Sequence, residues 1–267
     1  MALEIGKIKL KLEDVFQVAA KNEKVKLSPH AKMRIKKAHD YLIKRSKSGE
    51  VIYGVNTGFG ILSNVKVEDK DLAQLQLNLL RSHAVGTGEP LSREKVRAMV
   101  LLRASTLTQG HSGVSLRLVE ALLDLINHDI TPWIPEQGSV GASGDLSPLA
   151  HLALVLIGEG RAYVNGKLIS GKKALELKKL KPVVLRPKEG LALINGTQFM
   201  AALATFAILE AERLFRVANI SSAMTLEALR GTTTAFDPKI HAVRPHPGQI
   251  EVAKILRELL DHPDPVV

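Results

Sequence analysis

The sequence predicts a mainly helical protein in which β-structure is confined to short segments. Residues 115–129 carry apolar side chains at the spacing of one helix face. Residues 188–231 contain no proline and are apolar around much of the circumference of the helix they would form. Only residues 6–12 and 161–170 show patterns typical of strands. Together these features favour an all-α fold.

Predicted elements alternate with glycine-rich breaks in the N-terminal part of the chain. The sequence GKIKLKL at 6–12 alternates with period two and predicts a short strand. Ser28 followed by Pro29 is typical of a helix N-cap with proline at the first helical position, so a helix is expected from there through residue 46. The glycines of residues 51–60, VIYGVNTGFG, predict a loop.

Helices are expected to dominate the centre of the chain. Residues 72–84 and 93–110 predict two helices, and Ser92 can cap the second. Ser147 followed by Pro148 repeats the pattern of an N-cap with proline at the first helical position, which predicts a buried helix beginning at Pro148.

A hairpin is expected to precede the longest helical segment. Asn165-Gly166 suits a type I′ turn, which predicts the hairpin RAYVNGKLIS. After a connector rich in lysine and proline, residues 188–231 predict long helices, and residues 248–267 predict a further helix that prolines end. Long apolar helices pack against other long helices, so we expect partners from other subunits or from sequence outside this chain.

The composition excludes several kinds of chemistry. The 267 residues include no cysteine, which excludes disulfides, thiolate nucleophiles and cysteine-ligated metals and fits a reducing compartment. No histidine pattern resembles a metal motif such as H-E-x-x-H, so no metal site is expected. The N-terminus lacks a signal-peptide pattern, and no apolar run is expected to be long enough for a membrane span. We therefore expect a cytoplasmic protein that does not bind a membrane.

The charge balance is basic, with 37 Lys and Arg against 27 Asp and Glu, for a net charge of +10. The lysines are dispersed apart from clusters at 32–37 and 172–181, and aromatic residues make up only 4% of the chain, too few for a platform on which bases stack. A solvated, lysine-rich surface is the preferred interpretation, and no nucleic-acid partner is expected. A basic helical binding protein is the alternative from a different functional class.

The glycine-rich stretch GSVGASGDLSPLAHLALVLIGEG at 138–160 contains a tripeptide that can react with itself. The small residues Ala142 and Gly144 allow a sharp bend, in which the Gly144 nitrogen can attack the Ala142 carbonyl carbon and expel water. Ser143 can then lose its hydroxyl group and its α-proton as water and leave an exocyclic methylidene. The product is an electrophile built from backbone, next to Asp145, which could assist proton transfers. Without further context, GASG is only a turn before a helix.

That context comes from the rest of the chain. The stretch at 138–160 closely resembles the signature of the aromatic amino acid lyases, namely the histidine, phenylalanine and tyrosine ammonia-lyases and the related aminomutases. Four further segments resemble motifs of this family, in the family's order: YGVNTGFG at 53–60, QLNLLRSHAVGTGEPL at 76–91, EGLALINGTQ at 189–198 and RPHPGQIEVA at 244–253. The resemblance implies the fumarase/aspartase-like all-α fold, with a small N-terminal α+β part and long central-bundle helices.

The resemblance also implies a cofactor and catalytic residues. In the family the tripeptide, here Ala142-Ser143-Gly144, cyclises on its own to methylidene-imidazolone, and no external cofactor is needed. Tyr53 matches the family's catalytic tyrosine, and Asn195 matches an asparagine beside the prosthetic group. A tyrosine that packs in a turn and an asparagine that caps a helix are the structural alternatives. Asp145 and Gln198 have expected supporting roles, and for Gln198 the structural alternative is the stronger competitor.

The expected substrate is an aromatic amino acid. His83 in RSHAVG matches the position that contacts the substrate ring, and Gly60 and Leu62 are expected to line the pocket. A histidine can hydrogen-bond an imidazole or a phenol, whereas a benzene ring gains nothing from it. The resemblance thus favours L-histidine, converted to urocanate, and leaves tyrosine or phenylalanine ammonia-lyase and aminomutase as alternatives.

The sequence also departs from the family pattern. The run Gln-Asp-x-Tyr-Ser-x-Arg, which carries a substrate-binding arginine in the family, does not occur in these 267 residues. We expect residues 1–187 to be the domain that carries the prosthetic loop and residues 188–267 to begin the central bundle. The family implies a homotetramer, and the missing motif implies assembly with a complementary C-terminal chain. A lyase-derived fragment that is inactive by itself remains the second interpretation.

Overall fold

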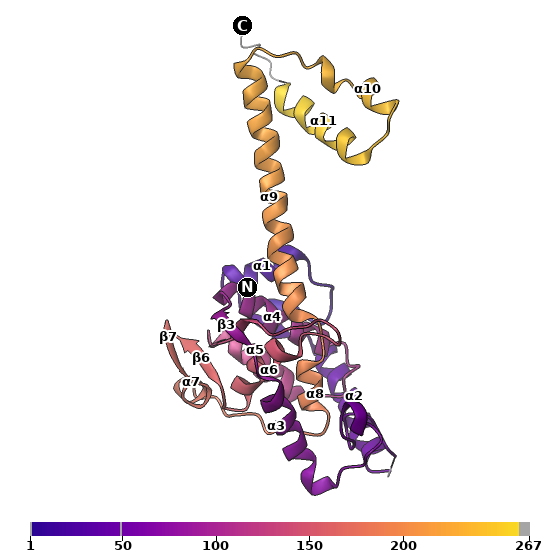
Figure 1. Cartoon of the computed structure of the whole chain (residues 1–267), viewed down its shortest axis with the longest axis vertical. Coiled ribbons are helices and arrows are strands. Elements are labelled where there is room, and N and C mark those ends of the chain that lie inside the picture. Colours follow the sequence, from indigo (N-terminus) through magenta and orange to yellow (C-terminus); the bar gives the residue numbers. More distant parts are fainter. Residues whose placement is uncertain (1, 49, 262–267) are drawn as a thin grey trace. The chain divides into compact units, whose positions relative to one another are not determined.

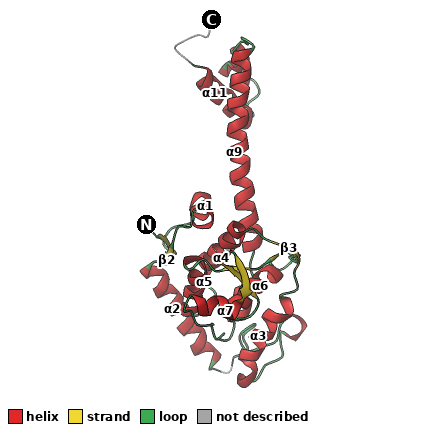
Figure 2. Ribbon diagram, turned by 90° about the vertical axis from the view of Figure 1, so that its left-hand side faces the viewer, coloured by secondary structure: helices red, strands yellow, loops and turns green. Residues whose placement is uncertain are grey.

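The computed structural model describes residues 2–48 and 50–261. Its contacts divide the chain into two compact units, Met1–Phe206 and Ala207–Val267. Helices make up most of the described chain and strands only short segments (Figure 2), which confirms the mainly helical class. The division falls inside a helix rather than between residues 187 and 188, and the domain boundary expected there stays a prediction.

The first unit contains helices of six to eighteen residues and short strands. The helices that lie wholly within it are α1 (Leu12–Ala20), α2 (Pro29–Ser46), α3 (Leu72–His83), α4 (Arg93–Leu107), α5 (Leu116–Asn127), α6 (Leu146–Leu156), α7 (Gly171–Leu177) and α8 (Glu189–Ile194). The strands are β1 (Leu3–Ile5), β2 (Val25–Leu27), β3 (Thr87–Pro90), β4 (Thr131–Pro132), β5 (Pro135–Gln137), β6 (Arg161–Val164) and β7 (Lys167–Ser170).

Three small sheets lie among these helices. Strands β1 and β2 pair in parallel, and β3 pairs with β5 in antiparallel fashion. Strand β6 pairs with both β4 and β7. The predicted hairpin is confirmed, because β6 and β7 are joined by Asn165 and Gly166, whose φ angles of 51° and 76° suit a type I′ turn.

Helix α4 lies at the centre of the first unit (Figure 1). It packs against α1 and α5, and its side chains from Val96 to Leu101 are all buried. Helix α6 packs against α3 and α8, and the tetrad Leu149, Ala150, Leu152 and Ala153 is fully buried. The two groups share one apolar core, so the glycine-rich stretch before α6 is attached to a rigid support.

The strand expected at 6–12 is wrong. Gly6 has φ +85°, a conformation that ends the extended segment directly after β1. Lys11 then becomes the N-cap of α1, and its backbone N–H donates to the Asp14 carboxylate at 2.9 Å. Helix α1 buries Val15 and Val18, a short apolar stripe that the alternating pattern before it concealed.

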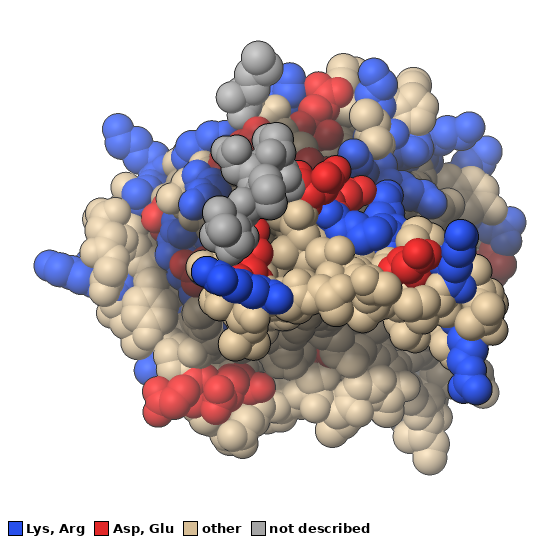
Figure 3. All heavy atoms as spheres, turned by 90° about the horizontal axis from the view of Figure 1, so that it is seen from above, with Lys and Arg blue, Asp and Glu red and all other residues tan. Residues whose placement is uncertain are grey.

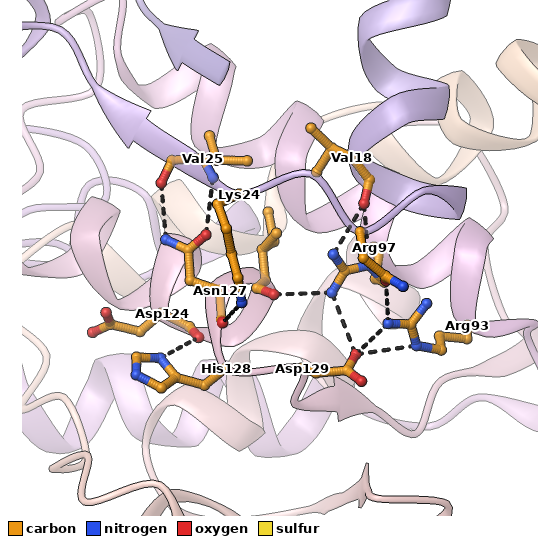
Figure 4. A network of polar contacts seen from close by, with 11 residues as sticks. Val18, Lys24, Val25, Arg93, Arg97, Asp124, Asn127, His128 and Asp129 are labelled. Carbon is orange, nitrogen blue, oxygen red and sulfur yellow. Dashed lines mark hydrogen bonds and ion pairs between the residues drawn. The ribbon is translucent and has the colours of Figure 1, made fainter. Parts of the chain in front are cut away.

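A polar network ties this N-terminal segment to α4 and α5 (Figure 4). The Asn127 side chain makes a two-way bond to the backbone of Val25, with its oxygen accepting at 2.9 Å and its nitrogen donating at 2.8 Å. The buried Arg97 guanidinium donates to the carbonyls of Val18 and Ile126 at 3.0 and 2.9 Å. Asp129 lies 3.4 Å from the same guanidinium. Arg97 is therefore a buried charge with several acceptors and a nearby counter-charge.

The predicted N-cap at Ser28 is confirmed, and the one at Ser147 is wrong. The Ser28 hydroxyl accepts from the Ala31 N–H at 3.0 Å, with Pro29 at the first helical position. Helix α6 instead begins at Leu146, with Asp145 as its N-cap residue. Ser147 is buried inside the first turn, where its hydroxyl has no partner among the described residues.

The apolar segment predicted at 188–231 forms two helices rather than one. Helix α8 ends at Ile194, residues 195–197 break the helix, and α9 runs uninterrupted from Gln198 to Ala228. By length and composition, residues 189–228 are also apolar enough to cross a membrane, contrary to the expectation that no apolar run is that long. Core helices of soluble proteins can have the same length and composition.

The second unit consists of the remainder of α9, α10 (Pro238–Ala242) and α11 (Pro247–Leu260). Helix α11 confirms the last predicted helix over the residues that the structure describes; residues 262–267 lie outside them. Along α9, large apolar side chains are exposed at Leu214, Val217, Ile220 and Met224. Their spacing of three or four residues places them on one face of the helix.

The basic side chains do not form one continuous patch on the face drawn in Figure 3. Lys and Arg are scattered there among Asp, Glu and uncharged surface. This view is consistent with the solvated, lysine-rich surface expected from the composition.

Candidate active site

The reactive tripeptide lies in an irregular loop between β5 and α6. Ala142 and Ser143 are exposed, whereas Gly144 and Asp145 are buried. Gly141 and Gly144 have φ angles of +67° and +103°, in the region that favours glycine. The loop therefore presents the serine to solvent while its C-terminal end is held in the interior.

Gly144 packs directly on the break between α8 and α9. A Cβ atom at this position would lie 2.7 Å from the carbonyl oxygen of Gly196 and 2.8 Å from its nitrogen, closer than real Cβ contacts. No side chain fits in this space. The two backbone segments can touch at this point because Gly144 has no side chain.

Asp145 fastens the loop to the same break. Its backbone N–H donates to the carbonyl of Gly196 at 2.6 Å. One carboxylate oxygen accepts from the Ser139 hydroxyl at 2.7 Å, and the other accepts from the backbone N–H of Met200 at 3.0 Å. Because Met200 lies in the first turn of α9, Asp145 caps that helix from another part of the chain. Its carboxylate is fully buried and both oxygens are engaged.

The loop at 51–60 is stabilised by its own polar side chains. The Asn56 side chain accepts from the Ile52 N–H and donates to the Glu50 carbonyl, both at 2.7 Å. The Thr57 hydroxyl accepts from the Gly54 N–H at 3.2 Å. Both side chains are buried. These bonds explain why this motif combines asparagine and threonine with glycines: the polar residues replace regular backbone pairing.

Tyr53 is presented at the surface of this loop. Its side chain is half exposed, and its ring makes an edge-to-face contact with Phe59, with the centroids 6.3 Å apart. Its hydroxyl has no hydrogen-bond partner within the described chain. The next residue, Gly54, packs against Leu191 of α8 so closely that a Cβ would overlap the leucine side chain. The tyrosine is thus carried on a loop that rests on α8.

His83 ends α3 with one ring nitrogen fixed. Its Nδ1 lies 2.8 Å from the Leu79 carbonyl, an acceptor, so Nδ1 carries a proton in this arrangement. In the neutral ring, Nε2 is then an acceptor. Two residues beyond Ala84, Gly86 lies against Gly138 at the start of the reactive loop. The end of α3 and the loop are therefore neighbours.

Asn195 and Gln198 lie on either side of Gly196. Asn195 is the C-cap of α8, and its exposed side chain has no hydrogen-bond partner among the described residues. Gln198 is buried at the start of α9, where it accepts from Arg103 and donates to Thr106. The Asn195 amide is therefore available to a ligand, whereas the Gln198 amide is engaged within the protein.

The two residues expected to line the pocket begin and end a short 3₁₀ helix, Gly60–Leu62. Gly60 is exposed with φ +57°, and a Cβ there would meet nothing within 4 Å. The Leu62 side chain lies outside what the structure describes. Neither residue is shown in contact with the reactive loop.

The structure brings the segments of the expected site together around α8. The loop at 138–145 touches Gly196, the tyrosine loop touches Leu191, and α3 reaches α8 through buried Gln76, whose side-chain oxygen accepts from the Leu191 N–H at 3.2 Å. No bond joins the side chains of Tyr53, His83 and Asn195 to one another. Their grouping rests on the backbone segments that carry them.

Two residues of this region were missed in the sequence. Gly196 is the contact point for both Gly144 and Asp145, and Arg103 of α4 lies buried behind it. A glycine that interrupts the apolar segment, and a lone arginine in the apolar run MVLLRAS, were the available signals. Neither signal identifies its spatial partner.

The described cavities include one away from these segments. A hollow of about 320 Å³ is lined by Pro90, Leu91, Arg93, Asp129, Thr131, Tyr163, Asn165 and Gly166. It contains none of the expected site residues. Among the described residues, no group of three or more His, Asp or Glu side chains is placed to hold a metal ion.

Comparison with known proteins gives consistent matches. The family model for aromatic amino acid lyases matches residues 10–264. The chain is 51% identical to a histidine ammonia-lyase of Myxococcus xanthus over 252 residues, which are 94% of this chain and 49% of that protein. It is 44% identical to the human histidine ammonia-lyase, over 99% of this chain and 41% of that protein.

Solved structures agree with the sequence matches. The histidine ammonia-lyase of Trypanosoma cruzi is 40% identical, with a TM-score of 0.90 over 96% of this chain and 50% of that one. Tyrosine aminomutase from Streptomyces globisporus is 35% identical, with a TM-score of 0.93 over 100% of this chain and 50% of that one. The chain thus spans about half the length of the relatives it matches.

Proposed function

The chain belongs to the aromatic amino acid lyase family and has its fumarase/aspartase-like helical fold, and from this premise we propose that it forms part of an ammonia-lyase. The reaction removes ammonia from an aromatic amino acid and leaves an α,β-unsaturated acid. The observation that carries the proposal is the Ala142-Ser143-Gly144 loop, whose last residue is held where only glycine fits.

The loop suits the self-formed methylidene-imidazolone group. Ring closure needs small residues and a sharply bent backbone, and the positive φ of Gly141 and Gly144 provides such a path. The exposed serine leaves the site of dehydration open to solvent. Gly196 and Asp145 would hold the ring in place, and when formed the ring supplies an electrophile that makes the amino group of the substrate a leaving group.

The side chains around the loop would bind and deprotonate the substrate. Tyr53, with a free hydroxyl on a braced loop, is the proposed base for the β-proton. Asn195, with a free amide, is the proposed donor to a substrate carboxylate or to a developing oxyanion. Asp145, with both oxygens engaged, would position the loop rather than transfer protons.

His83 supports histidine as the substrate. With a proton on Nδ1, its Nε2 can accept the N–H of a substrate imidazole. The same nitrogen could accept the O–H of a phenol, so tyrosine is the second candidate. The related proteins favour the imidazole, since the curated relatives described above act as histidine ammonia-lyases, whereas a solved neighbour is a tyrosine aminomutase.

Partners are needed to complete the proposed enzyme. The exposed apolar face of α9 at Leu214, Val217, Ile220 and Met224 would be covered by other helices of an oligomer, as in the homotetramer implied by the family. The relatives' remaining half would supply the arginine motif missing from this sequence. We place this assembly in the cytoplasm, in keeping with a cysteine-free chain.

Intact mass of the natively purified protein tests the proposal. A chain lighter by two water molecules would show that the ring has formed. Ser143→Ala has no hydroxyl group to lose, so this variant should be lighter by at most one water. Ammonia release is then measured with L-histidine, L-tyrosine and L-phenylalanine, with and without a complementary C-terminal chain. The proposal expects activity only with the second chain, and highest on L-histidine.

Two outcomes would contradict this assignment. An unmodified mass in the presence of the complementary chain would make the protein an inactive, lyase-derived fragment. Full activity of the 267 residues alone would show that the missing motif is not essential.

A further inference from the structure

Arg103 is a buried cation without a carboxylate partner within the described chain. Its side chain is only 3% exposed, and burial lowers its pKa to about 10, so it remains charged at neutral pH. Its Nε has no hydrogen-bond partner among the described residues. A buried charge of this kind is costly unless the surrounding groups compensate for it.

The Arg103 guanidinium bonds to both sides of the break between α8 and α9. Nη1 donates to the side-chain oxygen of Gln198, the first residue of α9, at 2.7 Å. Nη2 donates to the carbonyl of Ala192 in the last turn of α8. Because the helix ends at Ile194, no later residue of α8 can donate to this carbonyl. One side chain therefore fixes the end of one helix and the start of the next.

The same guanidinium lies against Gly196, which in turn holds the reactive loop. A Cβ at Gly196 would overlap both Nη1 of Arg103 and the side-chain oxygen of Gln198. On its other side Gly196 touches Gly144 and accepts the backbone N–H of Asp145. Arg103 thus packs against Gly196, and Gly196 packs against Gly144, with no space for a side chain at either glycine.

We propose that Arg103 is a positioning residue for the Ala142-Ser143-Gly144 loop, acting through Gly196 and Gln198. The role deepens the proposed function and rests on it. The guanidinium holds residues 195–197 in one conformation, so that Gly144 and Asp145 have a fixed support. It also places the free Asn195 amide, which lies in the same break. Arg103 itself contacts neither the tripeptide nor any group proposed to bind substrate.

Arg97 provides a matched control on the same helix. It is equally buried at 3% exposure and also donates to backbone carbonyls, but those belong to Val18 and Ile126. Replacing either arginine with methionine removes a buried charge from α4. Only the change at Arg103 should reach the reactive loop.

Residue-resolved amide hydrogen exchange on the 267-residue chain tests the proposal. The reporters are the N–H of Asp145, bonded to Gly196, and the N–H of Met200, bonded to Asp145. In Arg103→Met, exchange at both should accelerate at least about tenfold, beyond the change in global stability measured by denaturant. In Arg97→Met they should stay at the wild-type rate, while the N–H of His128 accelerates.

Two further variants keep the test decisive if Arg103→Met does not fold. Gln198→Met leaves the arginine in place and removes one acceptor, so the same two amides should accelerate to a smaller extent. Arg103→Lys keeps the positive charge but lacks the planar guanidinium that donates to two acceptors. It should therefore retain only part of the protection of these amides from exchange. The proposal is overturned if Asp145 and Met200 exchange at wild-type rates in these variants, or equally fast in Arg97→Met.

Intact mass separates failure of this inference from failure of the proposed function. If the wild-type chain is two waters lighter, Arg103→Met should contain a larger unmodified fraction than Arg97→Met, and equal fractions would contradict the positioning role. If the wild-type mass is unmodified, ring formation fails for this chain. The exchange rates then still decide whether Arg103 positions the loop.

Discussion

At the scale of single residues, the reactive loop depends on backbone conformations that few residue types adopt. Gly144 combines a positive φ with direct contact to Gly196, so it is constrained twice. Gly166 in the hairpin also has a positive φ, but a Cβ there meets nothing within 4 Å. Comparing substitutions at the two glycines therefore distinguishes the free-energy cost of a positive φ from the cost of a steric overlap.

Gly144→Ala is expected to destabilise the chain more than Gly166→Ala. Both substitutions place alanine at positive φ, which costs roughly 1 kcal/mol. The new methyl at 144 must also displace the Gly196 backbone, so a total loss of about 2–4 kcal/mol is expected there. Chemical denaturation measures both values. Equal losses would show that the Gly144–Gly196 contact is not tight.

His151 makes stability depend on pH. Burial and the positive charge of Arg161 lower its pKa below the usual value, and its Nε2 accepts the Gly86 N–H at 3.1 Å, which requires that nitrogen to be unprotonated. The unfolded chain binds the proton more readily than the folded chain does. The contribution of His151 to the free energy of unfolding should therefore be fully present above about pH 6.5 and should decrease as the pH falls toward its folded-state pKa.

His151→Gln should flatten this decline. Denaturant unfolding between pH 7.5 and about pH 5 measures the slope for the wild type and the variant. Substitution of the exposed His30 by glutamine is the control and should leave the slope unchanged. Glu159 should not contribute to the slope in this pH range, because its hydrogen bond from Arg81 lowers its pKa below the usual carboxyl range. An identical slope in His151→Gln would refute the assignment.

At the scale of elements, buried polar side chains fix the relative positions of helices, which hydrophobic packing specifies less precisely because it is not directional. Glu189, at the start of α8, is 1% exposed. One of its carboxylate oxygens accepts the Ser115 N–H at the N-cap of α5, and the other accepts the Arg186 N–H, both at 2.8 Å. This carboxylate fixes where α8 begins, and α8 supports the site.

Glu189→Gln is expected to destabilise the chain by about 1–3 kcal/mol, because one oxygen becomes an NH₂ donor facing a backbone N–H in the interior. The exposed Glu176→Gln should change stability by less than about 0.5 kcal/mol. Thermal and denaturant unfolding of both variants provide the measurement. The bridging role would be excluded by equal stability of the two variants.

At the scale of the whole molecule, the apolar face of α9 is the feature that the chain leaves unpartnered among the described residues. Leu214, Val217, Ile220 and Met224 follow one face of the helix and are exposed. Exposed apolar surface of this extent is typical of a protein interface. In the proposed assembly, the part of the relatives that this chain does not span, or further copies of the chain, would cover it.

Leu214→Lys with Met224→Lys should therefore weaken association of the chain. Burying one such side chain contributes about 1.5–3 kcal/mol, so each substitution should raise the dissociation constant at least about tenfold. Sedimentation velocity over a range of concentrations measures it, and Val184→Lys, at an exposed apolar position of the first unit, is the control. A wild-type chain that stays monomeric throughout, with or without the complementary chain, would contradict the interface.

Local signals in the sequence succeeded wherever a few neighbouring residues decide the structure. Ser28-Pro29 fixes a helix start and Asn165-Gly166 fixes a hairpin, because caps and tight turns depend on bonds within three or four residues. The same reasoning failed at residues 6–12, where Gly6 ends the extended segment and α1 follows, and at Ser147, which packing buries inside α6.

The sequence by itself determined the helical class, the family motifs and the identity of the tripeptide that can form an electrophile. Only the tertiary structure decided what supports that tripeptide: Gly196 beneath Gly144, Asp145 across the start of α9, and Arg103 behind both. These contacts join residues more than fifty positions apart, and no local preference encodes them. They arise because close packing brings distant segments into contact, and most of the buried polar groups at these contacts then bond to one another.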